Sequence, residues 1–197
     1  MGTILRKHLA LIIGWGVVVA ILIAVVSLVL PASYGAESAV LIISRDRSGV
    51  DPYTQAKSAE QVGSNLVQVL KTDDFFHKVM ASSFTFNKAR WNRLNDRDRR
   101  KLWNRDVNAT VVGGTSLLKI TTYSFTSQDS LALARAVTET MAAQGGDYVG
   151  GDIAFKVVDN PLLSPWLRRP NVIFNTLGGL LAGMVLAVLW LVYYKRT

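Results

Sequence analysis

Few residues of this chain are of the types that carry out covalent or metal chemistry. The chain has no cysteine and only two histidines, His8 and His77, which excludes a thiolate nucleophile and leaves too few histidines for a metal site. The adjacent carboxylates Asp73 and Asp74 follow Thr72 and precede an apolar run, a pattern that favours a helix start over an acid–base pair. No motif of a serine hydrolase, zinc protease or phosphate-binding loop occurs. We therefore expect no catalytic site, no metal and no cofactor, and a protein that is not an enzyme.

The strongest charged feature is a basic stretch over residues 88–105. It contains Lys88, Arg90, Arg93, Arg97, Arg99, Arg100, Lys101 and Arg105, diluted by Asp96 and Asp98. Such a stretch can bind acidic glycans or lipid phosphates, and Arg97, Arg100 and Lys101 are its candidate contacts. Arg168 and Arg169, next to the second apolar run, are further candidates for the same ligands. Charge runs more often form a solvated helix face or pair with a neighbouring subunit, and we favour that interpretation. Its expected buried side consists of Trp91, Leu94, Leu102 and Trp103, and Asn95 is its candidate cap.

Two uncharged apolar runs enclose this stretch, at residues 9–30 and 172–194. About 20 apolar residues suffice to cross a bilayer, so each run predicts a membrane helix. The competing interpretation of the first run is a cleaved signal peptide, whose apolar region is normally about 7–15 residues and therefore shorter. The residues that follow the run also lack a clean A-x-A cleavage pattern. We therefore expect two spans and an uncleaved N-terminus.

Basic residues flank the outer ends of both runs and predict the orientation. Arg6 and Lys7 precede the first run, and Lys195 and Arg196 follow the second, which places both termini in the cytoplasm by the positive-inside rule. Arg168 and Arg169 on the other side of the second run argue mildly against this, but the intervening loop is too long for the rule to apply. Five segments follow: a cytoplasmic N-terminus (1–8), a first span (9–30), an extracytoplasmic domain (31–170), a second span (172–194) and a cytoplasmic tail (195–197).

Small residues recur along one side of each predicted span. Gly16, Ala20 and Ala24 are four residues apart in the first, and Gly178, Gly179 and Gly183 lie in the second. Such residues let helix backbones approach closely in membranes, so these stripes predict contact with the other span or with a neighbouring subunit. Small residues are also common in membrane helices in general, which leaves a lipid-facing surface as the alternative.

The domain between the spans has the pattern of an α+β fold with a small sheet and packed helices. We expect strands at 38–44, 107–112, 117–125 and 153–158, and helices near 52–69, 72–80, 88–105 and 131–144, the last capped by Ser127 or Asp129. Gly113-Gly114 between two strands predicts a hairpin. Pro161, Pro165 and Pro170 follow the last expected strand. Because proline fixes φ and lacks an N–H, they predict an extended strap between that strand and the second span.

This C-terminal pattern resembles the Wzz-like polysaccharide co-polymerases, the chain-length determinants. The resemblance lies in a strand, the pair Val158-Asp159, spaced prolines, and a glycine-patterned second span. It covers almost the whole chain, because the family also has a first span near its N-terminus and an outer domain between the two. The family's prolines usually recur every three residues, whereas those of this chain are four and five apart. The region over about residues 74–105, broken near 82–86, resembles a short form of the family's helical arm.

The resemblance implies a multi-pass protein of the bacterial plasma (inner) membrane that regulates the length of an O-antigen, capsule or exopolysaccharide. It also implies a homo-oligomeric ring, a membrane polysaccharide polymerase as partner, and contact with the nascent glycan. Gram-positive members activate a cytoplasmic tyrosine kinase, for which the four residues after Tyr193 leave little room. Nucleic acid is not an expected partner. The alternative is a two-span sensor or adaptor whose outer domain binds a ligand. An enzyme acting on lipid-linked sugars would need catalytic residues that we do not find.

Overall fold

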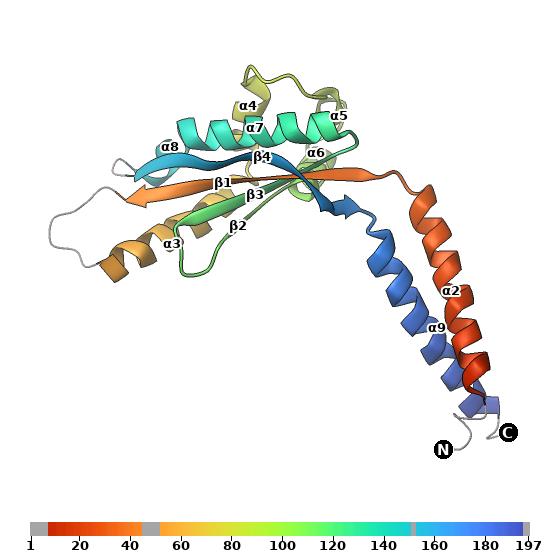
Figure 1. Cartoon of the computed structure of the whole chain (residues 1–197). Coiled ribbons are helices and arrows are strands. Elements are labelled where there is room, and N and C mark those ends of the chain that lie inside the picture. Colours follow the sequence, from red (N-terminus) through yellow and green to blue (C-terminus); the bar gives the residue numbers. More distant parts are fainter. Residues whose placement is uncertain (1–7, 45–51, 151–152, 195–197) are drawn as a thin grey trace. The chain divides into compact units, whose positions relative to one another are not determined.

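The computed structural model of the chain describes residues 8–44, 52–150 and 153–194, and these fall into two compact units (Figure 1). One unit is an α+β domain over residues 33–167, and the other contains the two apolar helices. The predicted fold class is confirmed: a small antiparallel sheet with packed helices lies between two long apolar helices in the sequence.

The sheet of the α+β domain has four strands among the described residues, in the order β2-β3-β1-β4. They are β1 (Ser33–Ser44), β2 (Val107–Val111), β3 (Leu117–Ser124) and β4 (Ile153–Arg169). The first and last strands of the domain are therefore neighbours, and β4 is an edge strand. β2 and β3 form the hairpin predicted from Gly113-Gly114. Gly114 has a positive φ of +72°, a backbone conformation that glycine adopts readily because it has no Cβ.

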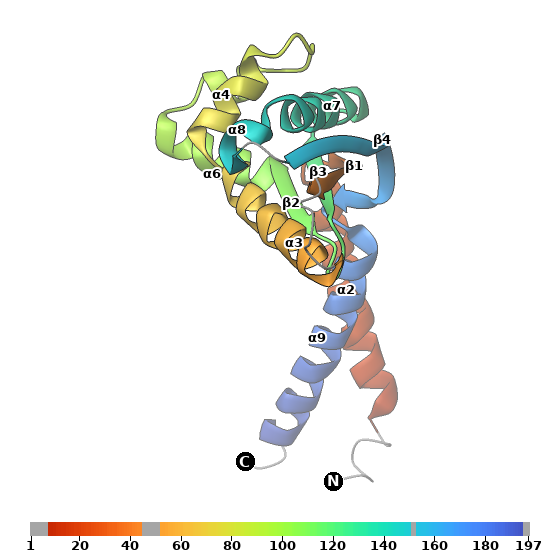
Figure 2. The same ribbon diagram turned by 90° about the vertical axis from the view of Figure 1, so that its left-hand side faces the viewer.

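Both long helices of the domain pack on the same face of the sheet. The Ser38 hydroxyl on β1 forms a 2.6 Å hydrogen bond with Thr138 on α7 (Ser127–Gln144). A Cβ added to Gly63 on α3 (Pro52–Val69) would meet Ile42, also on β1. Ser38 and Ile42 are an even number of residues apart, so they point to the same side of the strand. α7 contacts both β1 and β3, and it lies beside the sheet in Figures 1 and 2.

Some helices of the domain begin after a polar residue whose side chain accepts a hydrogen bond from a first-turn N–H. Thr72 caps α4 (Asp73–Ala81) by accepting a hydrogen bond from the Phe75 N–H, and Asn95 caps α6 (Asp96–Asp106) in the same way. Both caps were predicted. The expected cap of α7 was wrong: Thr126, rather than Ser127 or Asp129, accepts the Asp129 N–H, and the helix therefore starts earlier than residue 131.

The basic stretch folds as two short helices, α5 (Ala89–Asn92) and α6, whose tryptophans enter the core. Trp103 packs edge-on against Phe76 at 5.1 Å and donates a 2.8 Å hydrogen bond to the Leu70 carbonyl. Trp91 packs against Trp103 at 5.9 Å between ring centroids. The break expected near 82–86 is confirmed, because α4 ends at Ala81. Leu94 was expected on the buried side and is instead exposed. A single turn, α8 (Gly146–Val149), follows α7.

Two strands are longer than predicted, for different reasons. β1 starts at Ser33 rather than residue 38, although Gly35 and Ala36 have low strand propensity, because pairing with β3 continues to Tyr34↔Ser124. β4 was expected to end at residue 158 and continues to Arg169, through Pro161 and Pro165. The prolines are thus extended as predicted, but within the strand rather than after it. An edge position tolerates residues that have no N–H to give to the sheet.

Candidate functional site

The surfaces that the sequence singled out lie on the two apolar helices, on α6, and in β4. The helices α2 (Leu9–Val29) and α9 (Val172–Tyr194) are both long and apolar enough to cross a membrane. Only 17% of the most apolar window of each is buried. A core helix of a soluble protein would bury most of its apolar side chains, so this exposure favours a lipid environment over a protein interior.

The two apolar helices pack against each other along stripes of residues spaced by four. On α2 the buried positions include Ile12, Gly16 and Ala20. On α9 they are Gly179, Gly183, Ala187 and Leu191. Residues four apart lie on one face of a helix, so each stripe is continuous and the two meet over several turns. The predicted small-residue faces are thus used within one chain, between its own helices.

Glycine is required at the centre of this contact. A Cβ added to Gly183 would lie 2.9 Å from the Gly16 Cα and 3.0 Å from the Trp15 carbonyl oxygen, both of which are backbone atoms. At Gly179 it would lie 2.8 Å from the Ile23 Cδ1 and 3.3 Å from the Ala20 Cα. Backbone atoms cannot move aside as a side chain can, so a larger residue at Gly183 must separate the helices.

Two of the predicted packing residues have other positions. A Cβ at Gly178 would meet nothing within 4 Å, because this residue lies on the exposed side of α9. Ala24 is half-buried at the margin of the stripe. The sequence analysis missed a polar contact in the same pair: the Asn175 side-chain amide donates a 3.0 Å hydrogen bond to the buried Ser27 hydroxyl. Polar pairs of this kind stabilise helix association in membranes by about 0.6–2 kcal/mol.

The candidate basic contacts on α6 have unequal surroundings. Arg100 is bound to Asp73 through its Nε at 2.8 Å and through its Nη2, and this hydrogen bonding holds the pKa of Asp73 below its ordinary value. Lys101 lies 3.8 Å from Asp98 on the same helix. Arg97 is exposed and forms no ion pair with the residues that the structure describes. Of the three, Arg97 is the one most available to an external anion, and the exposed side of α6 matches the solvated face that charge patterning favours.

The two adjacent carboxylates do not form an acid–base pair. Asp73 faces the guanidinium of Arg100, whereas Asp74 accepts a hydrogen bond from the Tyr148 hydroxyl of α8. Burial raises the pKa of Tyr148, and the bond to Asp74 raises it further. Lys78 closes the group, 3.2 Å from Asp147 and 4.4 Å from the centre of the Tyr148 ring. These contacts fasten α8 to α4 and leave the carboxylates serving structural roles.

The structure describes the backbone of all the strap residues but the side chains of only some of them. Pro161 is buried within β4, and Pro170 follows the end of that strand. Pro165 and Arg168 lie in β4, but their side chains are outside the described part of the chain. Arg169 is exposed at the last position of the strand. The connections to the apolar helices are short: residues 30–32 join α2 to β1, and residues 170–171 join β4 to α9.

A buried ion pair is the other feature that sequence analysis missed. Arg90 and Asp106 are 2.8 Å apart, with side chains only 6% and 3% exposed. Burial lowers the pKa of Arg90, and the charge of Asp106 opposes that effect. Arg90 lies within the basic stretch and Asp106 directly follows it, where most neighbouring residues are charged. Only the nearby tryptophans signalled that one side of it enters the core.

No model of a known protein family and no curated protein matches this chain.

Proposed function

We propose that this protein is a polysaccharide co-polymerase of the Wzz-like kind, which regulates the chain length of a cell-surface glycan. The observation that carries the proposal is an architectural one. The first and last strands of the α+β domain are neighbours in one sheet, and each leads within two or three residues into a membrane-length helix. These two helices pair through glycines. The proline-containing strand and the glycine-patterned last helix supply the sequence resemblance.

The mechanism that fits this architecture is assembly rather than covalent chemistry. In the proposal both helices cross the bacterial plasma membrane, the domain over residues 33–167 faces away from the cytoplasm, and several copies form a ring beside a membrane polymerase. Neighbouring copies cannot use the glycine stripes that already join α2 to α9. Contacts between copies would therefore involve the outer domain and the exposed sides of the helices, where Gly178 offers a second small-residue surface.

Deleting the protein from its host should change the size distribution of the surface polysaccharide. Loss of a chain-length regulator removes the preferred length without removing the polymerase, so a gel of the extracted glycan should lose its modal band and keep the material. The wild-type sequence supplied on a plasmid should restore the band. An unchanged distribution would contradict the proposal and favour the two-span sensor.

The proposed orientation has its own test. Topology reporters fused after Thr197 and inserted at Gly113, in the exposed β2–β3 turn, should report opposite sides of the membrane, with Thr197 cytoplasmic. A mature N-terminus beginning near Ala36 would show that α2 is a cleaved signal and would remove the two-span architecture.

A further inference from the structure

A cavity of 420 Å³ lies on the helix-free face of the sheet. Its polar lining includes Glu37 of β1, Lys119 of β3, and Asp159 and Ser164 of β4. Glu37 is adjacent to Ser38, whose hydroxyl is bonded to α7 on the opposite face, so the Glu37 side chain points away from the helices. Because β1 lies between β3 and β4, it forms the floor of the cavity and its neighbours form the walls. The volume is within the range of about 300–1,000 Å³ typical of small-ligand sites.

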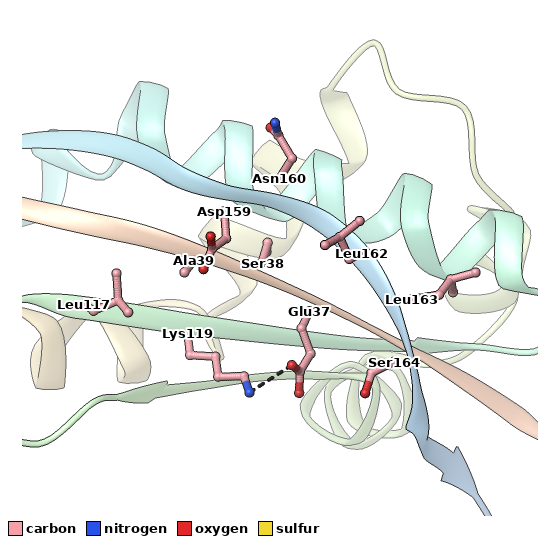
Figure 3. A pocket seen from close by; sticks show the side chains of 10 residues that line it. All are labelled: Glu37, Ser38, Ala39, Leu117, Lys119, Asp159, Asn160, Leu162, Leu163 and Ser164. Atoms are coloured by element: carbon pink, nitrogen blue, oxygen red, sulfur yellow. Dashed lines mark ion pairs between the residues drawn. The ribbon is translucent and has the colours of Figure 1, made fainter.

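The polar groups of the cavity come from three strands. Figure 3 shows the ion pair between Glu37 of β1 and Lys119 of β3, with Asp159 and Ser164 on β4. The Lys119 Nζ lies 2.9 Å from a Glu37 carboxylate oxygen, and both side chains remain partly exposed. The lining thus offers a ligand the Glu37 and Asp159 carboxylates, the Lys119 ammonium and the Ser164 hydroxyl. Ser38 and Asn160 also line the cavity, and the Ser38 hydroxyl is bonded to Thr138.

This set of groups selects against charged ligands. An anion such as a phosphate would face Asp159 and Glu37, and the single positive charge of Lys119 is already paired with Glu37. A cation would gain from the carboxylates, but it would have to approach the Lys119 ammonium in the same small space. A neutral hydroxyl can use both kinds of group, because it donates to a carboxylate and accepts from an ammonium at once.

The remaining lining is apolar and favours a ligand with a hydrocarbon face. Leu117 on β3 and Leu162 on β4 border the cavity, and Leu162 is 71% exposed. A sugar ring has hydroxyls around its edge and C–H groups on its faces, so it can bond to the charged groups while covering these leucines.

We propose that this cavity binds a neutral sugar unit of the glycan whose length the protein regulates. The inference rests on the proposed function, because it identifies the ligand of the outer domain as the polysaccharide itself. Asp159 and Lys119 would be its main hydrogen-bonding groups, and Ser164 a third. A regulator that binds a segment of the growing polysaccharide at β4 would sense the polymer through this strand, which leads into α9.

Binding is tested with the full-length protein in lipid nanodiscs. The probes are neutral oligosaccharides from partial acid hydrolysis of the host's own surface polysaccharide, and the readout is saturation-transfer difference NMR. We expect the wild type to bind, and Asp159→Ala and Lys119→Met each to raise Kd about tenfold or more, because each removes a charge-assisted hydrogen bond. The control is Glu139→Ala, which removes an exposed carboxylate from α7 and should bind as the wild type does.

The binding and deletion experiments distinguish failure of the sugar site from failure of the proposed function. Oligosaccharide binding that is lost in the two cavity variants and kept in Glu139→Ala supports the site. No binding by the wild type, or binding that both cavity variants retain, overturns it, even where deletion still changes glycan length. If Asp159→Ala loses both binding and the circular dichroism signal of the folded protein, its loss of binding does not test the site. Ser164→Ala, which removes a single hydroxyl, then takes its place. If that folded variant binds as the wild type does, the site is overturned. A negative deletion experiment refutes the proposed function, and the binding result still decides whether the cavity is a sugar site.

Discussion

Replacing Gly183 by leucine should separate the two apolar helices, whereas the same replacement at Gly178 should leave their pairing unchanged. A side chain at Gly183 would meet the Gly16 Cα at 2.9 Å, and one at Gly178 would meet open space. Both variants add the same apolar volume to the same helix, so their insertion into the membrane should be equal. Overpacking of a close contact costs about 1–3 kcal/mol, which is a loss of the paired state of roughly fivefold to more than a hundredfold.

The pairing can be measured by disulfide formation, because the natural chain has no cysteine. Ile12 and Ala187 are members of one buried cluster between the helices. Ile12→Cys combined with Ala187→Cys should therefore crosslink within one chain in native membranes, and the same pair should do so with Gly178→Leu. Adding Gly183→Leu should reduce the crosslink by at least about fivefold. Undiminished crosslinking would mean that the helices do not meet along this stripe in the membrane.

Because the glycine stripes join the two helices of one chain, they are not available for contacts between copies of the protein. A stripe such as Gly16/Ala20 looks the same in sequence whether it seats the chain's own second helix or a neighbour's. The close approach of Gly183 to Gly16 assigns it to the first role. If Gly183→Leu also abolishes an oligomer, association of copies requires that α2 and α9 first pair within each chain. Gly178→Leu then separates the two steps, because it changes only the exposed side of α9.

The parts of the fold that were predictable follow from local signals. Runs of apolar residues predicted both long helices. Thr72 and Asn95 predicted the starts of two further helices, and Gly113-Gly114 predicted the hairpin. The strand bounds that were wrong depended on a distant partner. Nothing local marks Gly35 and Ala36 as strand; their place in β1 comes from pairing with Tyr123 and Thr122 of β3. Likewise, Pro161 and Pro165 argue against a strand locally, but an edge position in the sheet accommodates them.

The candidate cavity could not be predicted, for the same reason. Glu37, Lys119 and Asp159 are far apart in sequence, and each is an ordinary charge on its own strand. Their convergence depends on the strand order β3-β1-β4 and on the register that sets Ala39 opposite Lys119. A change of one residue in that register would turn Lys119 toward the helices. Sequence reasoning could name the strands but had no means to order them.

Asp106 should be among the most sensitive positions of the α+β domain. Asp106→Asn leaves the Arg90 guanidinium in the core without its counter-charge, and the Nε and Nη1 atoms of Arg90 have no hydrogen-bond partner among the described residues. Removing one member of a buried ion pair typically costs about 3–5 kcal/mol. That is a large part of the roughly 5–15 kcal/mol by which domains are stable. The ring of Phe125, 4.0 Å from the guanidinium carbon, can offset only a fraction of it.

Chemical unfolding of the full chain in detergent, followed by far-ultraviolet circular dichroism, measures this cost. The matched control is Arg105→Ala, which removes a 59% exposed arginine that bonds to the same carboxylate at 3.3 Å. It should cost no more than about 1 kcal/mol, because exposed ion pairs contribute little. Replacing both charges, Arg90→Met with Asp106→Leu, should recover most of the stability lost in Asp106→Asn, since an apolar pair leaves no uncompensated charge. If Asp106→Asn and Arg105→Ala unfold at the same denaturant concentration, Arg90 is solvated in solution and the pair is not buried.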